Sequence, residues 1–161
     1  MRPPLPGIDL EGIFTLRNVQ DTDRIKAYLS EHQVRRAVIV GGGFIGLEMA
    51  ENLVHAGAEV SVIEMAPQVM APMDYSMASF VHEHLREQGV KLFLEQAVES
   101  FEEIEGGLAV CFQSGISLET DLVILSIGVR PETKLAEAAG LRIGEARGIE
   151  VNEYLQTSDP D

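Results

Sequence analysis

A glycine-rich segment that directly follows a short apolar run constrains the fold more than any other feature of the sequence. The apolar run is Ala37–Val40, and the segment after it reads Gly41-Gly42-Gly43-Phe44-Ile45-Gly46. Four apolar residues without polar alternation are typical of a strand that is buried on both faces of a sheet. The glycines therefore predict a sharp turn at the end of a central strand.

A helix is expected immediately after this turn, from about Phe44 to His55. Ile45, Met49 and Leu53 recur at helical spacing and are expected to form its apolar stripe. Gly57 is expected to end the helix, because glycine readily adopts the positive φ angle found after many helices. The sequence thus predicts a strand, a glycine turn and a helix in direct succession.

Strands and helices continue to alternate along the chain. Further strands are expected at Glu59–Ile63, Val90–Leu94 and Asp121–Ile127, and further helices at Asp21–Leu29, Asp74–Gly89 and Thr133–Ala139. Short runs separated by glycine turns indicate an antiparallel meander at Ala97–Ile104, Leu108–Phe112 and Ile116–Leu118. We therefore expect an α/β fold, a Rossmann-like three-layer domain with a central parallel sheet and an antiparallel β-meander in one crossover.

The side chains at the ends and on the faces of these elements can also be assigned. Asp21 or Thr22 is expected to cap the first helix. Its apolar stripe is expected at Ile25, Tyr28 and Leu29. Asp74 is expected to cap the third helix, with an apolar stripe at Met77, Phe80, Val81 and Leu85. Ile149 and Val151 are expected to add a last edge strand.

The motif glycines have separate expected roles in binding a dinucleotide. Gly41 would permit the tight turn, Gly43 would let a pyrophosphate approach the backbone, and Gly46 would let the helix pack close to the strand. Free N–H groups at the helix start would attract the phosphates. The alternative is a glycine-rich turn that binds no ligand. The strand before it, the helix after it and an acid at the end of the next strand favour the dinucleotide.

The acid is Glu64, which lies 23 residues after Gly41, close to the interval of about 20 in dinucleotide-binding folds. A carboxylate there accepts hydrogen bonds from a ribose 2′-hydroxyl and repels a 2′-phosphate. Residues 65–70, which begin with Met65, contain no Arg or Lys. This pattern favours NAD(H) over NADP(H). The alternative for Glu64 is a solvated acid at the end of a strand.

Composition excludes several classes of partner. The 161 residues carry a net charge of −14, which repels nucleic acid and anionic membrane surfaces. No apolar stretch approaches the roughly 20 residues of a membrane span. The single cysteine, Cys111, fits a reducing cytoplasm and is expected to be a half-buried packing thiol. The four histidines are expected at surface or helix-end positions, and we expect no metal site.

Five segments in fixed order resemble the NAD(H)-binding domain of FAD-dependent pyridine nucleotide-disulfide oxidoreductases. They are PPLPGIDLEGIFTLRN, VIVGGGFIGLEMAENL, VSVIEMAPQVMAPMD, DLVILSIGVRPET and VNEYLQTSDP. Together they span nearly the whole chain. The resemblance is closest to the branch that contains coenzyme A-disulfide reductases, NADH oxidases and NADH-dependent persulfide reductases.

The resemblance implies roles for particular residues. Phe44 would cover the flavin face and move aside for nicotinamide, Glu48 would lie near the nicotinamide carboxamide, and Gly128 would pass close to the dinucleotide. The alternatives are an apolar contact at the helix start, an acid that favours the helix dipole, and an ordinary loop glycine. The full expected set of cofactor-binding residues is Gly41, Gly42, Gly43, Phe44, Ile45, Gly46, Glu48, Glu64, Met65 and Gly128.

The resemblance further implies that the chain is part of a longer protein, whose FAD and dimerisation domains would be its partners. Residues 1–20 would be an extended segment leading from an FAD domain, residues 21–152 the NAD(H)-binding domain, and residues 153–161 the start of the return to the FAD domain. In the intact enzyme, hydride would pass from NADH C4 to flavin N5, and electrons then to a disulfide, persulfide or oxygen. This chain would bind NAD(H) but no FAD, and would have no turnover alone. The alternative is a stand-alone NAD-binding sensor or partner-binding module.

Overall fold

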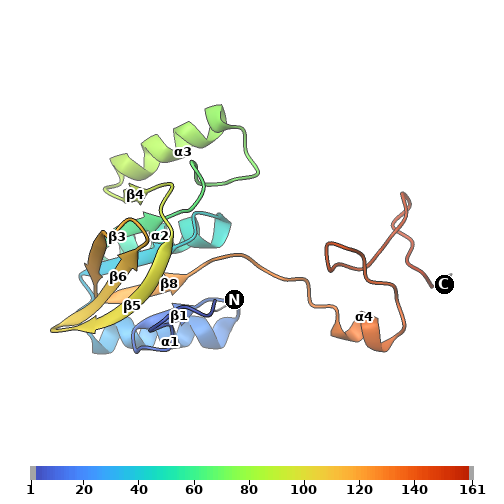
Figure 1. The fold of residues 1–161 in the computed structure, drawn as a ribbon, viewed down its shortest axis with the longest axis horizontal. Helices are drawn as coiled ribbons and strands as arrows, with labels where there is room; N and C mark the ends of the chain where they lie inside the picture. Colours follow the sequence, from blue (N-terminus) through green and yellow to red (C-terminus); the bar gives the residue numbers. More distant parts are fainter. Residues whose placement is uncertain (1–2, 160–161) are drawn as a thin grey trace. The chain divides into compact units, whose positions relative to one another are not determined.

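The computed structural model describes residues 3–159, and the chain divides into two compact units, Met1–Gly128 and Val129–Asp161 (Figure 1). No helix among the described residues is both long and apolar enough to cross a membrane.

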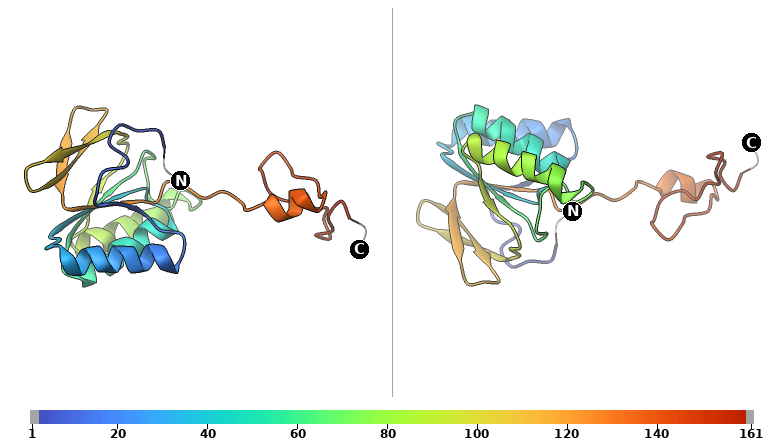
Figure 2. Two further views of the ribbon diagram at one scale, coloured as in Figure 1. Left: turned by 90° about the horizontal axis from the view of Figure 1, so that it is seen from below. Right: turned by 90° about the horizontal axis from the view of Figure 1, so that it is seen from above.

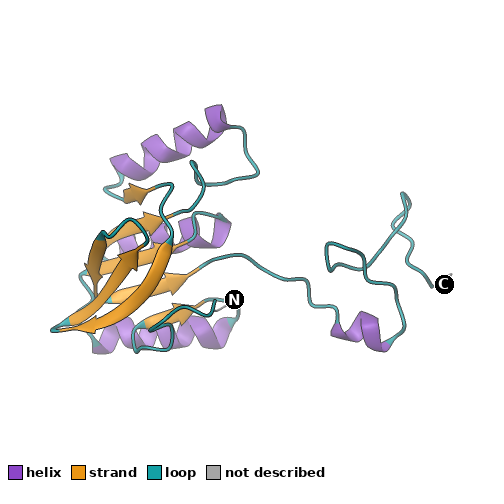
Figure 3. Cartoon of the chain, in the orientation of Figure 1, coloured by secondary structure: helices purple, strands orange, loops and turns teal. Residues whose placement is uncertain are grey.

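The first unit is built on a five-stranded parallel sheet (Figure 3). Its strands, in spatial order, are β1 (Ile13–Thr15), β8 (Leu122–Leu125), β2 (Arg36–Val40), β3 (Glu59–Ile63) and β4 (Lys91–Phe93). A separate antiparallel sheet contains β5 (Val98–Ile104), β6 (Gly107–Phe112) and β7 (Ser117–Thr120). This sheet is inserted between β4 and β8, so the predicted meander within one crossover is confirmed.

Three helices complete the first unit, and they cover the face of the parallel sheet opposite the antiparallel sheet (Figure 2). They are α1 (Val19–Glu31), α2 (Phe44–His55) and α3 (Tyr75–Glu87). The resulting order of layers is helices, parallel sheet and antiparallel sheet. The predicted Rossmann-like three-layer fold is therefore confirmed.

The apolar run in β2 is explained by these layers. Ala37 and Ile39 pack into the core on the helix side, whereas Val38 and Val40 pack into the core below the antiparallel sheet. In β8, Leu122 and Ile124 likewise face the opposite core from Val123 and Leu125. Both strands lack polar alternation because both of their faces are buried.

The predicted bounds of α2 match the structure, and its predicted stripe is confirmed at Leu53 and at Met49, which packs against the helix-side core, but not at Ile45. Gly46, Ala50 and Leu53 are buried, whereas Ile45 is 37% exposed. Gly46 and Ala50 complete the inward face, and because they are small they let the helix lie close to the sheet. Gly57 follows the helix with φ 91°, as predicted.

The predictions for the other two long helices, α1 and α3, are corrected by the structure. Asn18, not Asp21 or Thr22, caps α1, and Asp21 completes a capping box by accepting from the Asn18 N–H. Asp74 precedes α3 as predicted, although its side chain makes no capping hydrogen bond. The predicted inward stripe of α3 is wrong at Met77 and Phe80, which are exposed. The buried residues of α3 are Ala78, His82 and Leu85.

The ends of the chain also differ from the predictions. Residues 3–20 do not form one extended segment, because turns at Leu5 to Leu10 precede β1 and α1 already begins at Val19. The predicted last edge strand is reduced to a single bridge between Ile143 and Ile149. Val151 lies outside any strand.

The described residues of the second unit form one short helix, α4 (Lys134–Ala138), the Ile143–Ile149 bridge, and otherwise turns and irregular segments. Ala136 is its one buried hydrophobic residue among those described. Six large apolar side chains among its described residues are exposed, namely Val129, Leu135, Ile149, Val151, Tyr154 and Leu155. A segment of this size with so little apolar burial has no core of its own.

Asp121 joins the amino ends of β2 and β8. Its carboxylate accepts hydrogen bonds of 2.8 Å from the backbone N–H groups of both Arg35 and Arg36. Burial raises the pKa of Asp121, but the Arg36 and Arg35 N–H groups and the Arg36 guanidinium outweigh this effect, so its pKa lies below the ordinary value. The carboxylate therefore stabilises the sheet in its ionised form.

We expect Asp121→Ala to lower the free energy of unfolding by about 1–3 kcal/mol at neutral pH, because two N–H groups lose their acceptor. Since the pKa of Asp121 is lowered by folding, this contribution is present above about pH 4 and is lost as the pH falls through the folded value. Urea denaturation at several pH values measures both effects. Glu119→Ala is the control, because Glu119 is an exposed partner of Arg36. Equal stabilities of the two variants at neutral pH would contradict the prediction.

Candidate functional site

The candidate site lies where three neighbouring strands end. The glycine turn follows β2, Glu64 follows β3, and Ser126 follows β8. The strand β2 lies between β3 and β8, and the chain passes to β3 through α2 on one side and reaches β8 on the other only after the meander. Open parallel sheets bind ligands beyond the carboxyl ends of the strands at such a switch point.

Gly41 and Gly46 bring the helix and the strand together. Gly41 has φ 109°, and its N–H donates to the Ile63 carbonyl oxygen at 2.8 Å. A Cβ on Gly46 would lie 2.0 Å from the Gly41 carbonyl oxygen. A side chain could therefore be accommodated there only if the backbone moved. The structure thus confirms the packing roles predicted for these two glycines.

The peptide groups on either side of Gly42 are held by neighbouring loops. The Gly42 N–H donates to Glu64 Oε2 at 2.7 Å, and its carbonyl oxygen accepts from the Met70 N–H at 2.8 Å. The other carboxylate oxygen of Glu64 accepts from the Ala66 N–H at 2.8 Å. Glu64 is therefore not simply a solvated acid, because its half-buried carboxylate orders the glycine turn. Each oxygen retains a second lone pair that can accept from a hydroxyl.

Gly43 leaves the start of α2 open. It precedes the helix as N-cap with φ −83°, and a Cβ at this position would meet no atom within 4 Å. The first N–H groups of an α-helix have no partner within the helix, and they carry its partial positive charge. The turn therefore exposes a group of backbone donors suited to an anion such as phosphate.

Ser126 is a residue of this site that sequence analysis missed. Its hydroxyl lies 2.7 Å from the Gly41 carbonyl oxygen and 3.2 Å from that of Val40, so it can donate to either. The only signal for it in the sequence is a polar residue near the end of an otherwise apolar strand. Gly128, two residues later, has φ 90° and donates to the Ser126 carbonyl oxygen.

The remaining predicted site residues are exposed around the turn. The exposed fractions are 65% for Phe44 and 74% for Met65, and Glu48 is also exposed, one helical turn after Phe44. Large apolar side chains gain free energy when they are covered. Exposed beside the backbone donors, they form an apolar surface that a ligand or another domain can cover.

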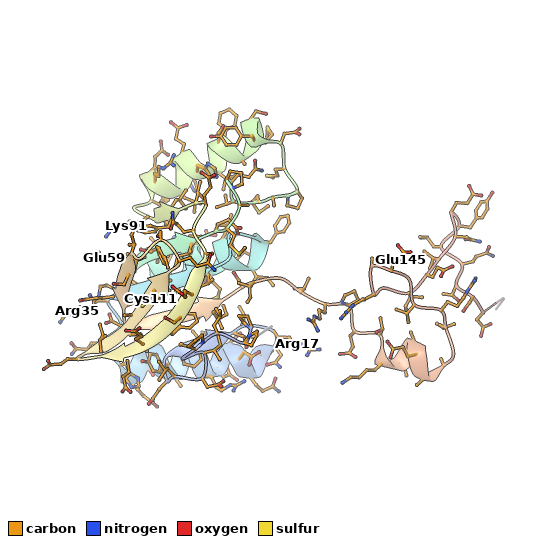
Figure 4. All side chains as sticks on the ribbon, viewed as in Figure 1. Arg17, Arg35, Glu59, Lys91, Cys111 and Glu145 are labelled. Carbon is orange, nitrogen blue, oxygen red and sulfur yellow. The ribbon has the colours of Figure 1, made fainter. Side chains whose placement is uncertain are left out.

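Several other reactive or charged groups are not part of the glycine turn. Cys111 is half-buried in β6, as predicted, and Glu59 and Lys91 pair across the starts of β3 and β4 at 3.4 Å (Figure 4). Within residues 3–159, no three His, Cys, Asp or Glu side chains are grouped as metal ligands. His82 is buried in α3, which corrects the prediction of a surface position.

Comparison with known proteins identifies the family. The sequence profile described as pyridine nucleotide-disulphide oxidoreductase matches residues 1–161. The chain belongs to this family. Its members are oxidoreductases that use NAD(H) and FAD and in which this domain is part of a larger polypeptide.

Relatives with different names match nearly the whole of this chain. An NADH oxidase from Methanocaldococcus jannaschii is 41% identical over 99% of this chain and 35% of its own length. The reduced CoADR-RHD of Bacillus anthracis is 52% identical with a TM-score of 0.90, over 99% of this chain and 28% of its own. An NAD-dependent persulfide reductase from A. fulgidus is 39% identical with a TM-score of 0.87, over 99% and 29%.

A further relative was solved bound to NADH. A water-forming NADH oxidase from Lactobacillus brevis bound to NADH is 31% identical with a TM-score of 0.84, over 100% of this chain and 35% of its own. The chain spans between 16% and 41% of the length of the curated relatives it matches.

We expect Gly46→Ala to lower the free energy of unfolding by about 1–3 kcal/mol, because the new Cβ forces α2 away from the Gly41 carbonyl. Gly43→Ser is the matched control, since its Cβ enters open space and serine is a favourable N-cap, so its effect should stay within about 0.5 kcal/mol. Thermal unfolding followed by circular dichroism compares the two. An equally stable Gly46→Ala variant would show that the close approach is not a constraint.

Proposed function

We propose that this chain is the NADH-binding domain of a flavin-dependent pyridine nucleotide-disulfide oxidoreductase. The observation that carries the proposal is the open group of backbone donors at Gly43, which lies next to a carboxylate already fixed by Gly42 and Ala66. The donors suit a pyrophosphate, and the carboxylate suits the hydroxyls of the adjoining ribose.

The charges around the turn support NADH rather than NADPH. Glu64 would repel a 2′-phosphate, and the exposed residue after it is Met65, which offers no positive charge. Residues 65–70 contain neither Arg nor Lys. The related oxidase from Lactobacillus brevis was solved bound to NADH, which agrees with this choice for the family branch.

In the intact protein, the proposed task of this domain is to place the nicotinamide ring against a flavin. Bound FAD would supply the capacity to accept a hydride and pass electrons onward. Phe44 and Glu48, both exposed at the start of α2, are the residues we assign to the nicotinamide end of the site. We assign Met65 to the adenosine end of the site. We expect the backbone at Gly128, just after β8, to pass close to the dinucleotide.

The electron acceptor would be a disulfide, a persulfide or oxygen, as the names of relatives suggest. This chain contributes one cysteine, Cys111, which lies half-buried in the antiparallel sheet. We therefore assign the redox cysteine to another part of the intact protein. We also propose a cytoplasmic location, with which the unpaired thiol of Cys111 is compatible.

We expect Gly43→Asp to abolish NADH binding without loss of stability. Aspartate is a favourable N-cap and its Cβ meets open space, but its charge would lie where the pyrophosphate has to bind. Titration followed by NADH fluorescence and calorimetry measures the affinity, and thermal unfolding confirms the fold. Gly43→Ser adds bulk without charge and should weaken binding less. Unchanged affinity in Gly43→Asp would contradict the proposed site.

We expect Glu64→Ala to reduce the preference for NADH over NADPH by about tenfold, equivalent to about 1.4 kcal/mol. The variant loses an acceptor for the ribose hydroxyls and a source of repulsion toward a 2′-phosphate. The ratio of the two affinities is the informative measurement, because any general loosening of the glycine turn affects both cofactors alike. A ratio equal to that of the wild type would argue against contact between Glu64 and the ribose.

A further inference from the structure

His82 is a buried polar side chain with no part in the site described so far. It lies in the middle of α3 and is only 3% exposed. Its Nε2 atom is 3.1 Å from the backbone nitrogen of Val69. Because the Val69 N–H donates, Nε2 has to accept, and the imidazole has to be neutral with its proton on Nδ1.

The loop that His82 holds is the same loop that supports the glycine turn. Val69 is fully buried, and its Cγ1 atom lies 2.8 Å from where a Cβ on Gly42 would be. The next residue, Met70, has φ 53° and donates its N–H to the Gly42 carbonyl oxygen. A non-glycine residue in this conformation is strained and requires support from its surroundings. The Val69–His82 hydrogen bond provides such support.

We infer that His82 is a positioning residue for the dinucleotide site, in which its neutral imidazole holds residues 69–70 against Gly42 and its protonation releases them. This inference rests on the proposed function, because the site it tunes is the NAD(H) site. The chain of contacts runs from His82 through Val69 and Met70 to Gly42, whose N–H is held by Glu64. Release of the loop would therefore disturb both the donors for the pyrophosphate and the carboxylate for the ribose.

The groups around the imidazole favour its neutral form. Burial lowers the pKa of His82, and the positive charge of Arg86, one turn along α3, lowers it further. The ring of Tyr75 meets it edge-on with a centroid distance of 6.3 Å, and the loop side presents the Val69 N–H. Since the folded pKa is below the ordinary value, the acceptor is present at neutral pH and is lost as the pH falls through that lower value.

The test measures binding of NAD⁺, which withstands acid, to the 161-residue chain by calorimetry between about pH 7.5 and about pH 5. For the wild type, we expect the dissociation constant to rise several-fold toward acid pH. His82→Gln retains a neutral acceptor that does not titrate, so its affinity should be near that of the wild type at neutral pH and should change less in acid. His82→Leu has no acceptor and should bind several-fold more weakly already at neutral pH. His84→Gln, an exposed position on the same helix, should behave as the wild type.

A second measurement separates this inference from the proposed function. The protection of the Val69 amide against hydrogen exchange, measured by nuclear magnetic resonance without cofactor and corrected for the intrinsic pH dependence of exchange, should fall in acid in the wild type and much less in His82→Gln. If NAD⁺ binds with the same pH dependence in the wild type and His82→Gln, the inference is overturned and the proposed function stands. If the wild type does not bind NAD⁺ at neutral pH, the proposed function fails, and Val69 exchange alone decides whether His82 holds the loop.

Discussion

The rest of the structure depends on the close approach between α2 and the end of β2. The two elements meet where Gly46 faces the Gly41 carbonyl oxygen, at a separation that excludes even one methyl group. This contact sets the position of the helix start and therefore the direction of its free N–H groups. It also places the Gly41 carbonyl within reach of Ser126, so that β8 and β2 end at one point.

The layers of the fold explain how the positions of the backbone groups in the site are fixed. The strands β2 and β8 are buried on both faces, on one side by helices and on the other by the antiparallel sheet. A strand that packs on both sides has little freedom to shift in register. The loops at its carboxyl end are therefore anchored to a rigid base, which a site built from backbone N–H groups requires.

The sequence predicted the elements and the glycine turn well, because both depend on local patterns. The bounds of α2, the meander and the approach at Gly46 all followed from apolar spacing and glycine positions. The inward face of α3 did not, because Ala78 and His82 are buried there while Phe80 is exposed. The burial of His82 depends on a hydrogen bond from Val69, and the role of Ser126 depends on the neighbouring strand. Neither contact leaves a repeating signal in the sequence.

Both carboxylate oxygens of Glu64 accept hydrogen bonds from the backbone, and this limits how the cofactor preference can change during evolution. An arginine in its place would offer a partner for a 2′-phosphate but would leave the N–H groups of Gly42 and Ala66 without their acceptor. This single substitution would thus raise the affinity for NADPH but would also disorder the glycine turn, which binds both nucleotides. A change of preference from NADH to NADPH would therefore require neighbouring positions to change together with Glu64.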